Sequence, residues 1–180
     1  MTGIVLALFF PAWVGIVTQA IQTQGSGRLL AVSLLLLCLD QARMAVVDLT
    51  QANAARTQGY DPRVERFYWV TVSTIGLELI GFYGAAVWLG LGTIGVLLSQ
   101  VWFHLLAGVQ LLPGAEGKVR VQDFGIRPRL PILAADLVGI ALVSLWLAAV
   151  WSQVAIAILF SLFLAYGLAK YGPVLFKRHP

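Results

Sequence analysis

Long apolar runs separated by short polar stretches extend through the whole chain. Each run is close to the roughly 20 residues that a helix needs to cross the hydrocarbon of a bilayer. Because lipid offers the backbone no hydrogen bonds, and because the runs lack period-two alternation, helices are expected rather than barrel strands. The pattern predicts an all-α, polytopic integral membrane protein with six transmembrane helices in three hairpins, over residues 3–21, 28–50, 67–89, 91–112, 131–150 and 153–172.

The connections between these helices alternate between short and long. Short outer turns are expected near Gly25, Gly90 and Trp151, and longer loops over residues 51–66 and 113–130. The second helix has no breaker before Gly59, so it should extend beyond the ~30 Å hydrocarbon core. Asp61-Pro62 fits an N-cap followed by a first helical position, which would start the third helix. Residues 1–180 then form a single transmembrane domain.

Composition agrees with this pattern, since 59% of the residues are hydrophobic, 11% are charged, and the mean hydropathy is +0.87. The basic residues gather in the two long loops and the tail, with only Arg28 in a short turn: Arg56, Arg63, Arg66, Lys118, Arg120, Arg127, Arg129, Lys177 and Arg178. The positive-inside rule then predicts that both termini lie on the cytoplasmic side of a bacterial cytoplasmic membrane, or of an organellar or thylakoid equivalent. We expect anionic lipid, and not nucleic acid, beside the 113–130 loop.

The first apolar run, Ile4 to Phe10, has the length of a secretory signal core. No Lys or Arg precedes it, and the apolar stretch continues past Pro11. We therefore expect a retained first span rather than a cleaved signal.

One carboxylate, Glu78, falls near the middle of the third predicted helix. A charged side chain at that depth is costly unless it is neutralised or paired. On one interpretation Glu78 is protonated or hydrogen-bonded to His104 or Gln100 and simply links two helices. On the other it forms a relay or cation site with His104 and Asp136.

Small and polar residues form one stripe of this third helix, and Glu78 belongs to it. The stripe consists of Thr71, Thr74, Glu78, Gly81 and Ala85. Because small residues mark close helix contacts in membranes, Glu78 should face protein rather than lipid. Gln100 and His104 are spaced i, i+4 on one face of the fourth helix, so we expect a polar seam between these two helices.

Other charged residues in the apolar runs allow two interpretations each. Asp40 and Arg43 lie three residues apart and can pair on their own helix, or Arg43 can bind a substrate. Asp48 is expected at the cytoplasmic interface. Lys170 can snorkel toward water and is expected to be structural rather than functional. His104 alone is more often a satisfied core histidine than a ligand.

A short pattern occurs twice. Leu77-Glu78-Leu79-Ile80-Gly81 with Trp88 is similar to Ala135-Asp136-Leu137-Val138-Gly139 with Trp146, at the same spacing. Two hairpins of equal orientation would form a parallel repeat. Chance similarity between leucine-rich helices is the alternative.

Common catalytic and cofactor motifs do not occur in the sequence. There is no glycine-rich phosphate loop, HExxH or GxSxG, and Cys38 is the only cysteine. No metal site is predicted and the cofactor is unknown: one chain cannot hold a bis-histidine haem with His104 alone, although a pigment or haem with one axial ligand stays open. An enzyme is the less favoured class.

Two functions of different classes remain. The first is a small transport-type membrane protein that handles a proton, a cation or a small polar solute, with a partner or as an oligomer. Its binding or relay residues would be Glu78, His104, Asp136, Asp40, Arg43 and Gln100. The alternative is a non-catalytic accessory subunit or assembly factor of a larger membrane complex, for example an energy-transducing one, in which the acids are structural.

Overall fold

The structure, a computed structural model, describes residues 2–114 and 118–176. Most of it is helical: α1 (Thr2–Gln22), α2 (Ser26–Gln58), α3 (Pro62–Ala85), α4 (Leu89–Leu106), α5 (Leu130–Leu147) and α6 (Ser152–Phe176). Between α4 and α5 the chain forms two strands, β1 (Val109–Pro113) and β2 (Val119–Asp123), and a 3-10 turn, η2 (Arg127–Arg129). The predicted helical fold is confirmed, with the β-hairpin as an addition.

Five of the helices are long and apolar enough to cross a membrane: α1, α2, α4, α5 and α6. This agrees with a multi-pass membrane protein. Helix α3 is not among the five, although its 24 residues are long enough to cross the hydrocarbon. Its central part mixes apolar residues with threonine, serine, tyrosine, glycine and Glu78, which lowers its mean hydropathy.

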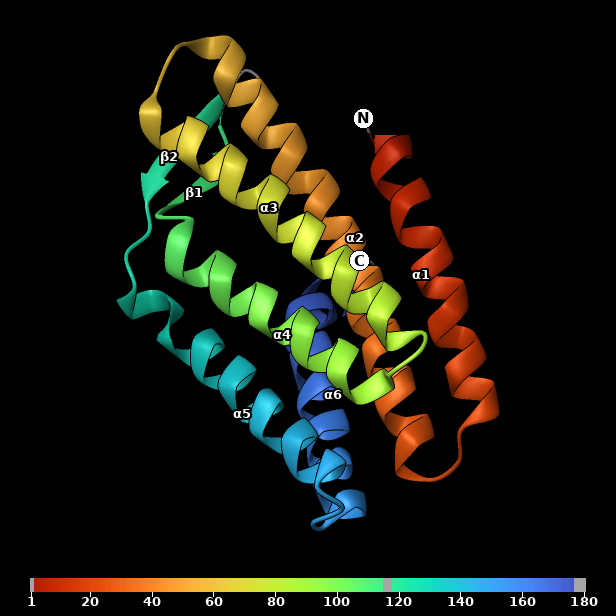
Figure 1. Ribbon diagram of the computed structural model, residues 1–180. Coiled ribbons are helices and arrows are strands. Elements are labelled where there is room, and N and C mark those ends of the chain that lie inside the picture. Colours follow the sequence, from red (N-terminus) through yellow and green to blue (C-terminus); the bar gives the residue numbers. More distant parts are fainter. Residues whose placement is uncertain (1, 115–117, 177–180) are drawn as a thin grey trace.

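Five helices form a closed ring around the centre of the molecule. Helix α2 packs on α3 and α6, α4 packs on α3 and α5, and α5 packs on α6. Helix α1 lies outside this ring, against α2 and α3, at the right-hand edge of Figure 1. Only side chains that point inward from the five ring helices can therefore meet at the centre.

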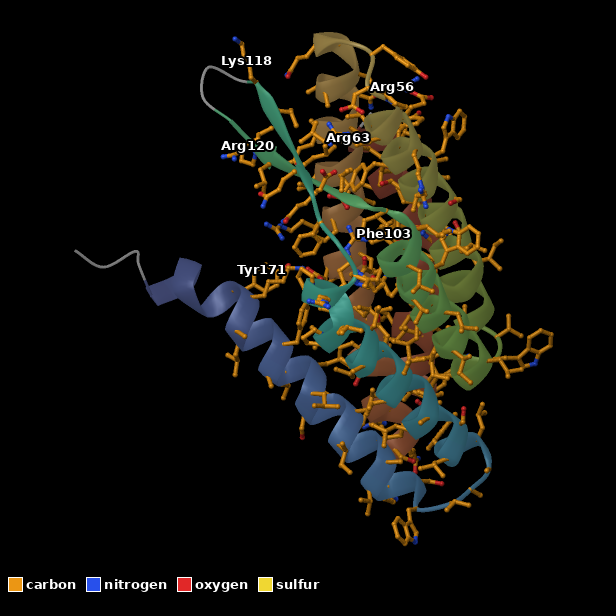
Figure 2. The ribbon with its side chains drawn as sticks, turned by 90° about the vertical axis from the view of Figure 1, so that its left-hand side faces the viewer. Arg56, Arg63, Phe103, Lys118, Arg120 and Tyr171 are labelled. Atoms are coloured by element: carbon orange, nitrogen blue, oxygen red, sulfur yellow. The ribbon has the colours of Figure 1, made fainter. Side chains whose placement is uncertain are left out.

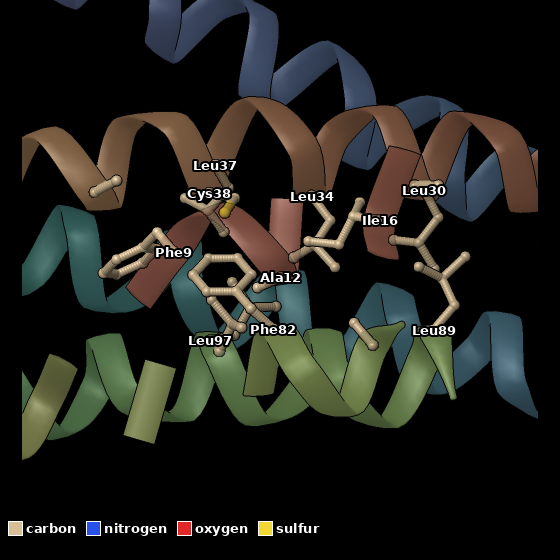
Figure 3. Close-up of a cluster of buried hydrophobic side chains, with 14 of the residues drawn as sticks. Phe9, Ala12, Ile16, Leu30, Leu34, Leu37, Cys38, Phe82, Leu89 and Leu97 are labelled. Carbon is tan, nitrogen blue, oxygen red and sulfur yellow. The ribbon is translucent and has the colours of Figure 1, made fainter. Parts of the chain in front are cut away.

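The main apolar core joins α1 to the ring (Figure 3). Phe9, Ala12 and Ile16 of α1 pack against a leucine-rich face of α2, and Phe82 of α3 is fully buried beside Phe9. The rings of Phe9 and Phe82 meet edge to face, with centroids 5.9 Å apart. Helix α1 is thus anchored mainly by apolar contacts, with two added hydrogen bonds, from the Tyr83 hydroxyl to the Leu8 oxygen and from the Gln19 amide to the Ala86 oxygen.

The α3–α4 contact depends on glycine. An added Cβ at Gly81 would lie 2.7 Å from the backbone nitrogen of Val96, and one at Gly92 would lie 2.1 Å from that of Ala85. Such distances leave no room for a methyl group. The predicted small-residue stripe is therefore confirmed as a helix-packing face: Thr71, Thr74, Glu78, Gly81 and Ala85 are all buried.

The predicted fourth helix, 91–112, is too long at its end. Helix α4 stops at Leu106, and Gly108 takes a positive φ of 66° that turns the chain. Val109 then pairs with Asp123, and Pro113 with Val119, in an antiparallel hairpin. The alternating residues of Val119-Arg120-Val121-Gln122 carried this signal, which the long apolar run before them obscured.

The α2–α3 end of the bundle carries the hairpin. Helix α2 runs for 33 residues, as its unbroken pattern predicted, and its last turns pack with α3 against β1. Val109 and Leu111 are buried there beside Ala52, Val64 and Phe67. Figure 1 shows the hairpin and the α2–α3 loop together at one end, and the α1–α2 and α5–α6 connections at the other.

The predicted start of α3 is confirmed. Asp61 is the N-cap, and its side chain accepts a hydrogen bond from the backbone nitrogen of Arg63 at 2.8 Å. The Arg63 guanidinium also donates to Asp61, and these bonds hold the pKa of Asp61 below its usual value. A second ion pair joins Arg63 to Asp123 of β2 at 3.0 Å, so the cap also fastens the hairpin.

Candidate functional site

A cavity of about 570 Å³ lies inside the five-helix ring, and β1 covers part of it. Five of the six predicted site residues line this cavity, from α2, α3, α4 and α5: Asp40, Glu78, Gln100, His104 and Asp136. Its volume is within the range of small-molecule sites. The sequence indicated a polar layer, and in the structure that layer is the wall of a single cavity.

The predicted polar seam between α3 and α4 centres on Glu78 and Gln100. Glu78 is 2% exposed, and the Gln100 side-chain amide donates a hydrogen bond to its Oε1. Two turns earlier on the same stripe, the Thr71 hydroxyl lines the cavity, is buried, and has no hydrogen-bond partner among the described residues. This bond occupies one Glu78 oxygen. Among the described residues, no cationic side chain forms an ion pair with the Glu78 carboxyl.

The next turn of α4 brings His104 toward α5. Its Nε2 lies 4.0 Å from Oδ2 of Asp136, which is too long for a hydrogen bond. That Asp136 oxygen is buried and has no hydrogen-bond partner in the described part of the chain. Glu78 and Asp136 therefore lie beside one face of α4, on which the i, i+4 spacing placed Gln100 and His104. Glu78 contacts Gln100, and Asp136 lies near His104.

The prediction that Asp40 pairs with Arg43 is wrong. Asp40 instead receives Lys170 of α6, at 2.8 and 2.7 Å to its two carboxylate oxygens, and a hydrogen bond from the Tyr171 hydroxyl. Arg43 is exposed, donates to the Tyr171 oxygen at 3.2 Å, and is not part of the described cavity lining. Figure 2 shows Tyr171 toward the C-terminal end of α6.

Lys170, expected to be structural, pairs with Asp40 across two helices. Its ammonium group lies at the cavity wall, bonded to Asp40 and to the Tyr166 hydroxyl at 2.9 Å. Asp48, expected at the interface, is half-buried and lines the same cavity. Helix α6 lies beside α2 and supplies partners for Asp40 that the local sequence of α2 does not reveal.

Arg129 is a cavity residue that the sequence assigned to a polar loop. It is 3% exposed, and its guanidinium donates to the backbone oxygens of His104 at 2.9 Å and Val109 at 3.2 Å. It also stacks over the Phe124 ring, 5.0 Å from the ring centre.

The chemistry of the cavity is that of an amphipathic binding site. Its walls are largely apolar, with Phe67, Leu97, Phe103, Leu159 and Phe163 among the lining residues. In the described part of the chain, no group of three or more His, Cys, Asp or Glu side chains could hold a metal ion. The predicted basic residues Lys177 and Arg178 and the acidic Glu116 lie outside the described residues.

Comparison with known proteins adds no relative: no family model, curated protein or solved structure matches this chain.

Proposed function

We propose that this protein is a small transport-type membrane protein, which handles a proton, a cation or a small polar solute in the central cavity. The observation that carries the proposal is the convergence of Asp40, Glu78, Gln100, His104 and Asp136 on one cavity. Ionisable groups inside a membrane protein are costly, and they characteristically mark ion paths, proton relays and solute sites. Purely structural acids would be expected to have all their oxygens bonded, whereas a buried Asp136 oxygen is not.

The proposal includes six membrane crossings, with α3 as the third. Its polar stripe is buried, while Leu77, Ile80 and Tyr83 on its other side are exposed. Such a helix still offers lipid an apolar face. Support for the orientation comes from Arg56, Arg63, Lys118 and Arg120, which Figure 2 shows near the hairpin end. We place that end in the cytoplasm, against anionic lipid.

A flux measurement on Glu78→Gln tests the proposal. The full chain is reconstituted in liposomes that contain a pH-sensitive dye, and proton entry is followed under an imposed potential. We expect the variant to lose at least about tenfold in rate, because an amide cannot exchange a proton or hold a cation. Asp123→Asn is the matched control, since that carboxylate is exposed on β2 and does not line the cavity. Near-normal proton flux in a folded Glu78→Gln protein would contradict the transport proposal.

A second candidate function is the accessory subunit or assembly factor. It is favoured by a groove of about 600 Å³ on α3 and α4, whose lining includes Gly84, Gly92, Gly95, Trp88 and Trp102. Glycines in such a groove allow close approach of another membrane helix. Purification in mild detergent distinguishes the two functions: a monodisperse monomer with no partner counts against the subunit.

A further inference from the structure

The cavity contains more acceptor oxygens than the protein supplies with donors. The Thr71 hydroxyl and Asp136 Oδ2 are buried without a hydrogen bond among the described residues. Thr71 itself is 2% exposed, so bulk water does not substitute for a partner. Glu78 receives one bond, from a neutral amide. Buried oxygens of this kind cost free energy unless something donates to them, and a ligand with N–H donors would do so.

Charge in the cavity favours a cation. Four carboxylates line it, Asp40, Asp48, Glu78 and Asp136, against the two cationic side chains of Lys170 and Arg129. Lys170 is committed to Asp40, and Arg129 donates to two backbone oxygens. Among the described residues, Glu78 and Asp136 have no cationic partner within 4.0 Å, apart from the contact of His104 to Asp136 at that limit.

The apolar walls indicate that this cation has an organic body. Phe67 and Phe103 meet edge to face with centroids 5.9 Å apart, and both line the cavity with Leu97, Leu159 and Phe163. An inorganic ion would leave these walls unused, and the described acids do not form a cluster that could hold a metal ion. Aromatic faces also attract ammonium groups directly.

We propose that the cavity binds an organic ammonium ion, a protonated amine with an aromatic or aliphatic body, with Glu78 of α3 and Asp136 of α5 as the acidic groups of the site. Gln100, which is bonded to Glu78, and His104, near Asp136, lie one turn apart on α4 between these acids. The apolar body lies against Phe67, Phe103 and Phe163. This inference rests on the proposed function, because it names the class of solute that the cavity takes.

Calorimetric titration of the purified full chain in nanodiscs tests the inference with three probes of one shape. These are 2-phenylethylammonium, neutral 2-phenylethanol and anionic phenylacetate, the neutral probe also reporting partition into lipid. We expect the ammonium to bind at least about tenfold more tightly than either isostere. Glu78→Gln and Asp136→Asn should each weaken ammonium binding about tenfold or more. Asp123→Asn should leave it unchanged.

Each other outcome overturns the inference in a recognisable way. Equal affinity for the three probes would identify an apolar cavity without charge selection, and preference for phenylacetate would assign the site to Arg129 and His104. Ammonium binding that persists in both acid variants would place it elsewhere, and absence of binding would reject the class. If Glu78-dependent proton flux is retained while the ammonium fails to bind, the proposed function stands and only this inference falls.

Discussion

The α3–α4 and α5–α6 pairs contain the same short pattern and use it differently. In each, an acid precedes a glycine by three residues, and both acids, Glu78 and Asp136, face α4. Gly81 lies against backbone of α4, whereas Gly139 meets only side chains, with an added Cβ 3.1 Å from the Leu97 Cδ1. The first pair is fixed by close backbone packing. The second is looser, and few of its residues are buried: on α5, only Leu133, Gly139 and Val143.

The two helix pairs therefore differ in rigidity and in the access to the cavity that they allow. The seam of α3 and α4 holds Glu78 at a fixed place, while α5 and α6 complete the cavity with fewer buried contacts and with polar attachments to the other helices. Two of these attachments are made by charged side chains at the cavity: the first is Lys170 on Asp40, and the second is Arg129 on the end of α4. A solute that enters the ring laterally would therefore meet the least resistance beside α5 and α6.

The largest effect should come from adding a methyl group to the seam. Gly81→Ala and Gly92→Ala put Cβ within 2.7 and 2.1 Å of backbone atoms, so the helices must separate. We expect the free energy of unfolding to fall by about 3 kcal/mol or more, at the upper end of overpacking costs. This fall is net of the roughly 1 kcal/mol that alanine gains over glycine in helix propensity. Thermal unfolding in detergent, followed by helical circular dichroism, measures it.

Two alanine variants control for propensity. Gly139→Ala meets side chains that can shift, and Gly76→Ala on α3 meets nothing within 4 Å. Both should unfold near the wild-type temperature or above it. If Gly139→Ala destabilises as much as Gly81→Ala, the two pairs are equally tight and the contrast between them disappears.

A smaller effect is expected from the attachment of α6. Lys170→Met leaves Asp40 at a largely buried site without its ammonium partner, with the Asp40 side chain 10% exposed. Removing one partner of a buried pair costs about 3–5 kcal/mol, and because Lys170 is 22% exposed we expect about 2 kcal/mol here. The loss should appear as faster amide exchange in α6 while α3 and α4 stay protected.

The double variant Asp40→Asn/Lys170→Met sharpens this test. It removes the stranded carboxylate together with the lysine, so it should recover at least half of the lost stability. A double variant as unstable as Lys170→Met alone would show that the lysine acts through packing of its aliphatic stem.

What the sequence could and could not predict follows the same division. The face of α3 was predictable because Thr71, Thr74, Glu78, Gly81 and Ala85 repeat at helical spacing within one element. The Asp40–Lys170 pair was not, because it joins residues 130 apart. Local spacing suggested Arg43 as the ion-pair partner of Asp40. A sequence shows which residues share a helix face, but it does not show which helix lies opposite that face. Arg129 was missed because its partners are backbone oxygens, which have no sequence signature.

The smallest effect should follow loss of the second attachment. His104 contributes one of the last four carbonyl oxygens of α4, which have no partner within the helix, and Arg129 donates to it at 2.9 Å. The guanidinium thus acts as a cationic C-cap for α4 delivered by the start of α5. Arg129→Gln should cost about 1 kcal/mol, the net worth of a typical hydrogen bond, because glutamine can keep one of the two bonds.

Arg127→Gln is the matched control, two residues earlier on η2 and exposed. Hydrogen exchange of the amides between Phe103 and Leu111 distinguishes the two variants: Arg129→Gln should speed exchange there and at the start of α5, and Arg127→Gln should not. The distinction matters for the cavity, because fraying of the last turn of α4 displaces His104 from Asp136. Equal exchange in both variants would mean that β1 alone holds the end of α4, and that the α5–α6 pair depends on Lys170 for its place in the ring.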